Sequence, residues 1–170
     1  MDGRGVTQDD LRAVMRRWAT GVTLVTAQHA GRPHGMTVSS FTSVSLDPPL
    51  VLVALERSSV THGMVEQSAA FAVALLNEAQ IDLAERFAGR VPDQEDRFAG
   101  VAYRTAVTGA PIPDGCLATL DCRRRAAHPA GTHTIFVGEV LAVGGDPGGR
   151  PLLYYDRHYR RLHEALNGGP

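Results

Sequence analysis

The feature that constrains the fold most is a series of short apolar segments rich in β-branched residues and separated by Gly, Pro and Asp. Segments of this kind, with turn residues between them, are typical of β-strands. About seven are found, at 22–27, 34–46, 50–55, 70–76, 116–127, 132–145 and 151–155. They do not alternate regularly with helices, which disfavours a doubly wound parallel sheet. The pattern therefore predicts a mainly β fold, an antiparallel barrel with a few helices packed outside it.

Two of these segments carry further expectations. The segment 34–46 is long and rich in Ser and Thr, and it is expected to bend near Ser39 and Ser40. The segment 50–55 is entirely apolar, so it is predicted to be buried on both faces.

Three or four short helices are expected around the strands. The first begins at Asp9 or Asp10, either of which can cap it, and ends at Thr20 and Gly21. Its apolar residues recur at helical spacing: Leu11, Val14, Met15 and Trp18. The other helices are predicted at 61–68, 79–89 and 158–166.

The size of the chain suits one domain. Its 170 residues are expected to form a flexible leader at 1–8, a domain at 9–166 and a tail at 167–170. The polar N-terminal segment lacks an apolar signal region, and the apolar runs are shorter than the ~20 residues that cross a bilayer. Cys116 and Cys122 are expected to be buried thiols, because six positions along one strand span ~20 Å. These features predict a soluble, cytoplasmic protein.

The charges exclude several function classes. All 17 basic residues are Arg, so neither a lysine Schiff base nor a phosphate-loop lysine is possible. The net charge of -1 gives no electrostatic case for nucleic acid or membrane as a partner. No H-E-x-x-H or C-x-x-C motif occurs, and no metal site is expected.

Two hydroxyl-rich clusters flank the apolar segment 50–55. The first, 35–41, combines small residues with little side-chain bulk, which lets a ligand approach the backbone. The second, 58–61, precedes a predicted helix, whose first N–H groups can hold a phosphate. Each cluster also has a simpler interpretation. The segment 35–41 could be an ordinary edge strand, and the segment 58–61 could serve only as the N-cap of the helix. Together they favour a planar ligand that carries a phosphate.

Several motifs occur in a characteristic order. They are TGVTLVT at 20–26, GMTVSSFTSVSLDPPLVLVAL at 35–55, FAVALL at 71–76, LAERFAG at 83–89, DRFAGV at 96–101, HTIFVGEV at 133–140 and PLLYYDRHYRRL at 151–162. With them, nearly the whole chain resembles the flavin reductase family of two-component flavin-dependent monooxygenases. The resemblance implies a split β-barrel, a Greek-key barrel of six or seven antiparallel strands, that forms a homodimer.

The resemblance also implies an activity. The enzyme would be an NAD(P)H-dependent flavin reductase, in which NADH or NADPH reduces FAD or FMN. The reduced flavin would then pass to a separate monooxygenase component. Such hydride transfer needs little from protein side chains, because the cofactors carry the chemistry.

The site implied by the resemblance has four parts. The flavin ring and ribityl chain would lie against Thr37, Val38, Ser39, Ser40, Ser45, Ala54 and Leu55. The phosphate would be held by Ser58, Ser59 and Thr61. The helix that carries Arg86 and Phe87 would close on the phosphate or on the ring. The nicotinamide side would be formed by His133, the expected catalytic residue, together with Tyr154 and Tyr155.

The chain departs from the family pattern at two positions. Thr132 stands where an Asp often precedes the histidine, and Ala74 stands where an Asn is common. Two other functions stay open from the sequence. One is a flavin-binding split-barrel protein with little turnover, and the other is a flavin oxidase of the pyridoxamine-phosphate oxidase type.

Overall fold

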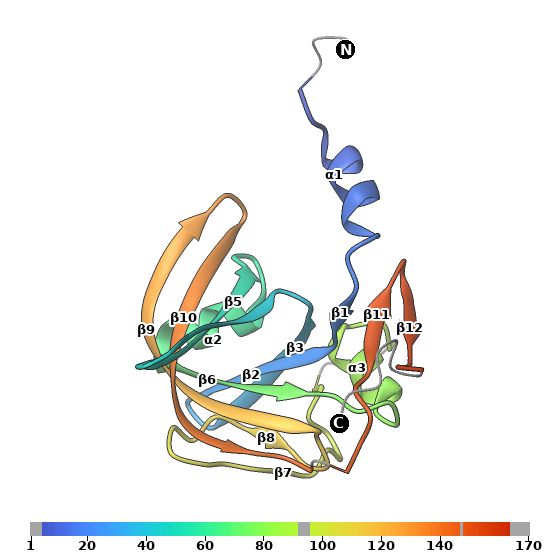
Figure 1. Cartoon of the computed structure of the whole chain (residues 1–170). Coiled ribbons are helices and arrows are strands. Elements are labelled where there is room, and N and C mark those ends of the chain that lie inside the picture. Colours follow the sequence, from blue (N-terminus) through green and yellow to red (C-terminus); the bar gives the residue numbers. More distant parts are fainter. Residues whose placement is uncertain (1–4, 92–95, 147, 164–170) are drawn as a thin grey trace.

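The computed structural model describes residues 5–91, 96–146 and 148–163. Its main element is a seven-stranded antiparallel sheet with the order β3-β2-β6-β9-β10-β5-β4 (Figure 1). The strands are β2 (Thr23–His29), β3 (Arg32–Val38), β4 (Phe41–Leu46), β5 (Pro49–Glu56), β6 (Ala70–Leu75), β9 (Ala118–Ala130) and β10 (His133–Gly144). The mainly β, antiparallel fold predicted from the sequence is confirmed.

The two edge strands of this sheet are joined directly at one corner, which we call the seam. The edge strands β3 and β4 are consecutive in the chain, and only Ser39 and Ser40 separate them. The predicted bend at these two serines is confirmed. The Ser40 hydroxyl donates to the Ala54 carbonyl at 2.7 Å, which ties the seam to β5. Edge strands carry backbone groups that no neighbouring strand uses, so the seam offers N–H donors to a ligand.

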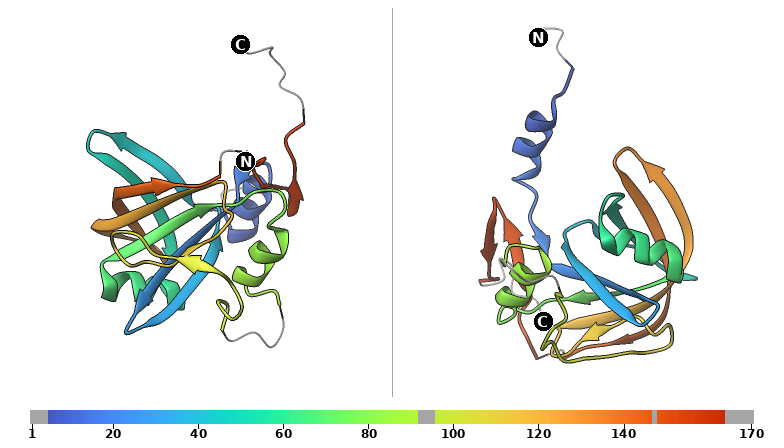
Figure 2. Two further views of the ribbon diagram at one scale, coloured as in Figure 1. Left: turned by 90° about the horizontal axis from the view of Figure 1, so that it is seen from below. Right: turned by 180° about the vertical axis from the view of Figure 1, so that it is seen from behind.

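Two small sheets complete the β structure. One has the order β1-β11-β12 and is formed by β1 (Thr20–Gly21), β11 (Leu153–Tyr155) and β12 (His158–Arg160). The other pairs β7 (Tyr103–Arg104) with β8 (Ile112–Pro113). The β1-β11-β12 sheet and α3 (Ile81–Phe87) lie together on one side of the barrel (Figure 2).

The core has two main clusters because β2, the strand between β3 and β6, is buried on both faces. Val25 belongs to the cluster inside the main sheet, with Phe71 and Phe136. Leu24 belongs to the cluster beneath α3, with Phe87. All five side chains are fully buried, and each contributes about 1.5–3 kcal/mol of hydrophobic stabilisation. Helix α2 (Val60–Ser68) packs against β2, β3, β5 and β6.

The segment 50–55 corrects one expectation. Within β5, Val51, Val53 and Leu55 are buried, but Leu50 and Leu52 are half-exposed. The prediction that this strand is buried on both faces is therefore wrong for the single chain, because only one face of β5 meets the core.

The C-terminal part of the chain gives a second correction. A helix was expected at 158–166, but the structure has the strand β12 at His158–Arg160, and 164–166 lie outside the described residues. Asp156 and Arg157 have φ angles of 47° and 64°, which turn the chain back so that Leu153 pairs with Arg160. The predicted tail at 167–170 also lies outside the described residues.

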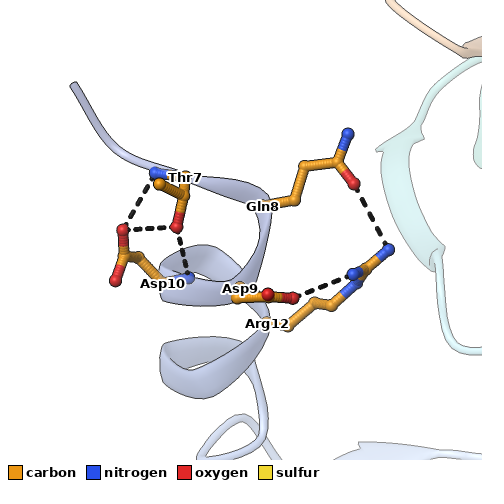
Figure 3. A network of polar contacts seen from close by, with 5 residues as sticks. All are labelled: Thr7, Gln8, Asp9, Asp10 and Arg12. Atoms are coloured by element: carbon orange, nitrogen blue, oxygen red, sulfur yellow. Dashed lines mark hydrogen bonds and ion pairs between the residues drawn. The ribbon is translucent and has the colours of Figure 1, made fainter.

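The N-terminal helix α1 (Gln8–Met15) projects away from the barrel and buries none of its residues (Figure 1). Its N-cap is Thr7, and not Asp9 or Asp10 as expected. The Thr7 hydroxyl accepts from the Asp10 amide at 3.2 Å, while the Asp10 carboxylate accepts from the Thr7 amide at 2.9 Å (Figure 3). This reciprocal capping box starts the helix inside the predicted 1–8 leader, of which 1–4 are outside the described residues. The chain then continues into β1, where the sequence predicted only a helix end.

The two cysteines agree with the prediction. Cys116 and Cys122 are both free and buried. Burial raises the pKa of both thiols, so neither is poised to react as a thiolate.

Candidate functional site

Two adjoining hollows lie where the seam of the barrel meets α3. The first, the central cavity, has a volume of about 170 Å³ and is lined by Gly21, Val22, Thr37, Val38, Ser39, Ala88, Arg90, Tyr154 and Tyr159. The second, the hydroxyl cleft, has a volume of about 310 Å³. It is lined by His34, Met36, Thr37, Ser58, Ser59, Val60, Thr61, Phe87, Ala88 and Arg97. Thr37 and Ala88 line both, so the hollows adjoin each other.

Strand β3 and helix α3 are fixed to each other at this point. The Thr37 hydroxyl donates to the Ala84 carbonyl at 2.6 Å. A Cβ on Gly35 would come within 2.9 Å of the Phe87 ring and of Thr26. Glycine is therefore what lets β3 approach α3 this closely. As a result the end of α3 forms a wall of both hollows.

The hydroxyl cleft is built at the start of α2. The Ser59 hydroxyl caps this helix, accepting from the His62 amide at 3.2 Å and donating to the Glu56 carbonyl at 2.8 Å. The buried Thr61 hydroxyl lies 2.9 Å from His34 Nδ1. Hydroxyls and a helix N-terminus together form a surface that suits an anion.

A cationic side chain, that of Arg97, also lines the hydroxyl cleft and favours the binding of an anion there. The Arg97 guanidinium lines the cleft and donates to the carbonyls of Gly35 at 3.0 Å and Phe87 at 2.8 Å. Burial, followed by the charge of Arg97, lowers the pKa of His34. His34 is therefore neutral at neutral pH, and Arg97 is the cationic side chain among the described residues that line the cleft.

The rim of the central cavity is a polar network. The Arg90 guanidinium pairs with Glu85 at 2.8 Å and donates to the Tyr154 hydroxyl at 3.5 Å. Tyr159 donates to Glu85 and packs its ring against Tyr154 at 5.4 Å between centroids. Burial and the Glu85 carboxylate raise the pKa of Tyr159, so it stays a neutral donor. The network holds an aromatic wall beside the cavity.

Eight of the residues implied by the family resemblance line these hollows. They are Thr37, Val38, Ser39, Ser58, Ser59, Thr61, Phe87 and Tyr154. Phe87 is fully buried and meets the cleft only as part of its floor.

Other implied residues lie elsewhere. Leu55 points into the core, Ser45 is half-buried on β4, and Tyr155 is exposed on β11. Arg86 donates to the Ala99 carbonyl at 2.8 Å and borders a different hollow. Ala54 bonds with Ser40, as described above.

His133 lies at the start of β10, beside the loop that leads to the hydroxyl cleft. It is exposed and pairs in register with Glu56, and the Arg57 amide donates to the Thr132 carbonyl at 3.0 Å. Its Nδ1 lies 2.9 Å from the Thr132 hydroxyl. Thr132 can thus orient the imidazole at the position where the family often has Asp. The other departure, Ala74, is buried in the core cluster beneath α3.

Three residues of the site were not predicted from the sequence: Arg90, Arg97 and Tyr159. Arg97 and Tyr159 lie within the motifs at 96–101 and 151–162, and those motifs were the signal that could have identified them. Arg90 follows the motif at 83–89 directly, but nothing in its local sequence assigns it a role.

Residues 15–163 match the family described as "Flavin reductase like domain". The chain belongs to this family. A curated relative from Streptomyces coelicolor, "Actinorhodin polyketide dimerase", is 41% identical over 96% of this chain and 91% of its own. The "Flavin-dependent monooxygenase, reductase subunit HsaB" of Mycobacterium tuberculosis is 37% identical over 87% of this chain and 79% of its own.

A solved structure supports the fold and the ligands of the family. It is the NADH:FAD oxidoreductase SgcE6 of Streptomyces globisporus in complex with NAD and FAD fragments. It is 36% identical, with a TM-score of 0.84 over 97% of this chain and 100% of its own. The family, the split-barrel fold, the enzyme class and the flavin and nicotinamide cofactors predicted from the sequence are confirmed.

Two further findings concern membranes and metals. None of the helices in the described part of the chain is long and apolar enough to cross a membrane. Within the same residues, no cluster of three or more His, Cys, Asp or Glu could hold a metal ion.

Proposed function

We propose that this chain transfers a hydride from NADH or NADPH to FAD or FMN at the seam of its barrel, and supplies the reduced flavin to a separate monooxygenase. The observation that carries the proposal is that two different hollows adjoin at Thr37 and Ala88. One is a cleft suited to an anion, and the other is a cavity with an aromatic wall and small side chains. A flavin has the same two parts, a phosphate and a planar ring.

The hydroxyl cleft fits the flavin phosphate. Ser58 and Ser59 present hydroxyls at the N-terminus of α2, and Arg97 brings a guanidinium whose other N–H groups can bind a phosphate oxygen. The neutral His34 adds no charge to this cleft at neutral pH, and its ring lies against Thr61.

The central cavity fits the ring. Thr37, Val38 and Ser39 lie along the free edge of β3, where backbone N–H groups can bind the carbonyl and nitrogen atoms of the isoalloxazine. When bound, flavin supplies a ring that accepts a hydride from nicotinamide. The chain itself must orient the two rings and stabilise negative charge with these donors. Hydride transfer between the two bound rings therefore needs no pair of acidic and basic side chains.

The proposal includes a role for His133 in contacting the nicotinamide. Its support is the hydrogen-bond distance to Thr132, which can fix the orientation of the ring, and its place beside the loop to the hydroxyl cleft. The test is the His133→Ala variant in rapid-mixing experiments. We expect a higher KM for NADH with the affinity for flavin unchanged. A hydride-transfer rate equal to that of the wild type at every NADH concentration would exclude the role.

We also propose that the enzyme is a homodimer. The outer face of the sheet carries apolar side chains that no part of the single chain covers completely: Leu50 and Leu52 on β5, and Ile135 and Val137 on β10. Leu52 pairs in register with Val137, so the patch is continuous across the two strands. A second copy would bury it. The two free, buried cysteines fit the reducing cytoplasm, which we propose as the location.

Steady-state kinetics with the four pairings of NADH or NADPH with FAD or FMN test the proposed function. We expect at least one pairing to give flavin-dependent oxidation of the nicotinamide. Binding of flavin without turnover in all four pairings would contradict the proposal and favour a flavin-binding protein. Hydrogen peroxide made from a substrate other than nicotinamide would favour an oxidase.

A further inference from the structure

Arg90 carries the one charged side chain among the described residues that line the central cavity. Its carboxylate partner, Glu85, does not line this cavity and instead borders a separate hollow, beside Arg86. The positive charge of the ion pair therefore faces the cavity, whereas the compensating negative charge lies outside it. A cation in this position favours an anion in the cavity over a neutral ligand of the same shape.

The end of α3 fixes the backbone of Arg90. Gly89 has a φ of 72°, a left-handed conformation that glycine adopts readily and that ends a helix. The Gly89 amide donates to the Arg86 carbonyl at 3.1 Å, and the Arg90 amide donates to the Glu85 carbonyl at 3.1 Å. This pair of bonds is the Schellman arrangement of a helix C-terminus. It brings the backbones of Arg90 and Glu85 together, so their side chains can pair.

A second element holds the side chain of Arg90. Its guanidinium pairs with Glu85 at 2.8 Å and donates to the Tyr154 hydroxyl at 3.5 Å, and Tyr159 donates to the same carboxylate oxygen of Glu85. Both tyrosines belong to the β1-β11-β12 sheet, which lies beside α3 (Figure 2). A guanidinium has five N–H donors, and these two contacts leave others for a ligand. The charge is thus held at the cavity wall by two elements that are distant in the chain.

We propose that Arg90 stabilises the negative charge that a flavin ring acquires on reduction, and so shifts the binding preference of the central cavity toward reduced flavin. A hydride carries one proton and two electrons. Its transfer from NADH leaves NAD+ and adds one negative charge to a ring that is neutral when oxidised. An interaction that is made only with this charge favours the transfer. The inference rests on the proposed function, which places the ring in this cavity.

The test compares the affinities of the full-length protein for oxidised and reduced FMN. Reduced FMN is prepared with dithionite, and both titrations are run without oxygen and without NADH, so the result does not depend on turnover. We expect Arg90→Gln to lower the ratio of the affinity for reduced FMN to that for oxidised FMN about tenfold. For a two-electron couple, a tenfold loss makes the reduction potential of bound FMN about 30 mV more negative. Spectroelectrochemistry measures this potential independently.

Three further variants separate the charge of Arg90 from its shape. Arg90→Lys keeps the charge and should retain most of the ratio. Glu85→Gln removes the opposing charge but keeps an acceptor for Arg90, so the ratio should rise. Arg86→Gln is the matched control, because Arg86 donates to the Ala99 carbonyl and does not line the central cavity; it should leave the ratio unchanged. The Arg90 side chain is 53% exposed, so its variants should fold.

Two results would overturn the proposal. One is a ratio and a potential that Arg90→Gln leaves unchanged. The other is an equal loss of affinity for both forms of FMN, which would show that Arg90 only shapes the cavity. Oxidation of NADH is assayed on the same wild-type sample. Turnover together with a ratio insensitive to Arg90 refutes this inference alone, whereas absence of turnover with every pairing of nicotinamide and flavin refutes the proposed function.

Discussion

At the scale of residues, Arg86 and Arg97 show where inference from sequence stops. The motif at 83–89 pointed to Arg86, and the structure turns this side chain to the Ala99 carbonyl, while Phe87 faces inwards. Neighbours in a helix project about 100° apart, so the two cannot share a face. Arg97 reaches the hydroxyl cleft from a loop, and loop placement depends on contacts that no local pattern encodes.

These two arginines give a matched pair of variants. Arg97→Gln should weaken FMN binding about tenfold, because a charge-assisted bond to phosphate is lost. Riboflavin, which has no phosphate, should bind the variant as it binds the wild type. Arg86→Gln should change neither affinity. Equal losses for FMN and riboflavin would show that Arg97 acts on the shape of the cleft and not on the phosphate.

His34 gives a prediction about pH. Its pKa is lowered in the folded chain from an ordinary value of 6.5, so the unfolded chain binds the proton at a higher pH than the folded chain does. The free energy of unfolding therefore falls as the pH drops below the ordinary pKa of 6.5, and it stops falling once His34 is protonated in the folded chain as well. We expect the wild type to lose stability relative to His34→Gln between about pH 7 and pH 5, measured by urea unfolding. A difference that does not change with pH would contradict the account.

At the scale of elements, most strands were predictable and the last hairpin was not. The β-branched segments from 22 to 145 form strands close to the expected bounds, because their pattern of apolar residues matches burial against a sheet. The hairpin of β11 and β12 has Asp156 and Arg157 at its turn, where the sequence signal is normally Asn-Gly or Asp-Gly. Without that signal, 158–166 read as a helix.

The turn between β11 and β12 also predicts the effect of a substitution on stability. Arg157→Gly removes the strain of a positive φ, and the free energy of unfolding should rise by about 1 kcal/mol. A gain of this size raises the melting temperature by about 2–4 °C for a chain of this length. Arg160→Gly, within a strand, should instead lower the melting temperature. A destabilised Arg157→Gly variant would refute the strained turn.

At the scale of the whole molecule, the site lies at the corner where the two edge strands are joined. Ser39 and Ser40 make this connection, and the central cavity and the hydroxyl cleft both lie beside it. The sequence could identify the hydroxyl-rich segment but not this arrangement, because pairing between β5 and β10 and between β9 and β6 is set by contacts distant in the chain.

The proposed dimer makes a prediction at this scale. Sedimentation of the wild type should give a mass about twice the 18.2 kDa of one chain. Leu52→Glu and Val137→Glu place a charge in the outer patch and should yield monomers, because burial of an unpaired charge is costly. Val107→Glu, at an exposed loop position, is the control. A wild-type monomer, or variants that stay dimeric, would refute this interface.

If this chain supplies a separate monooxygenase, the flavin that it reduces must leave the site. The most direct test places the enzyme and NADH without oxygen on one side of a membrane that retains proteins, with oxidised flavin on both sides. We predict that flavin on the enzyme-free side loses its oxidised absorbance, because reduced flavin leaves the site and crosses. Reduction confined to the enzyme side, or none at all, would contradict the account.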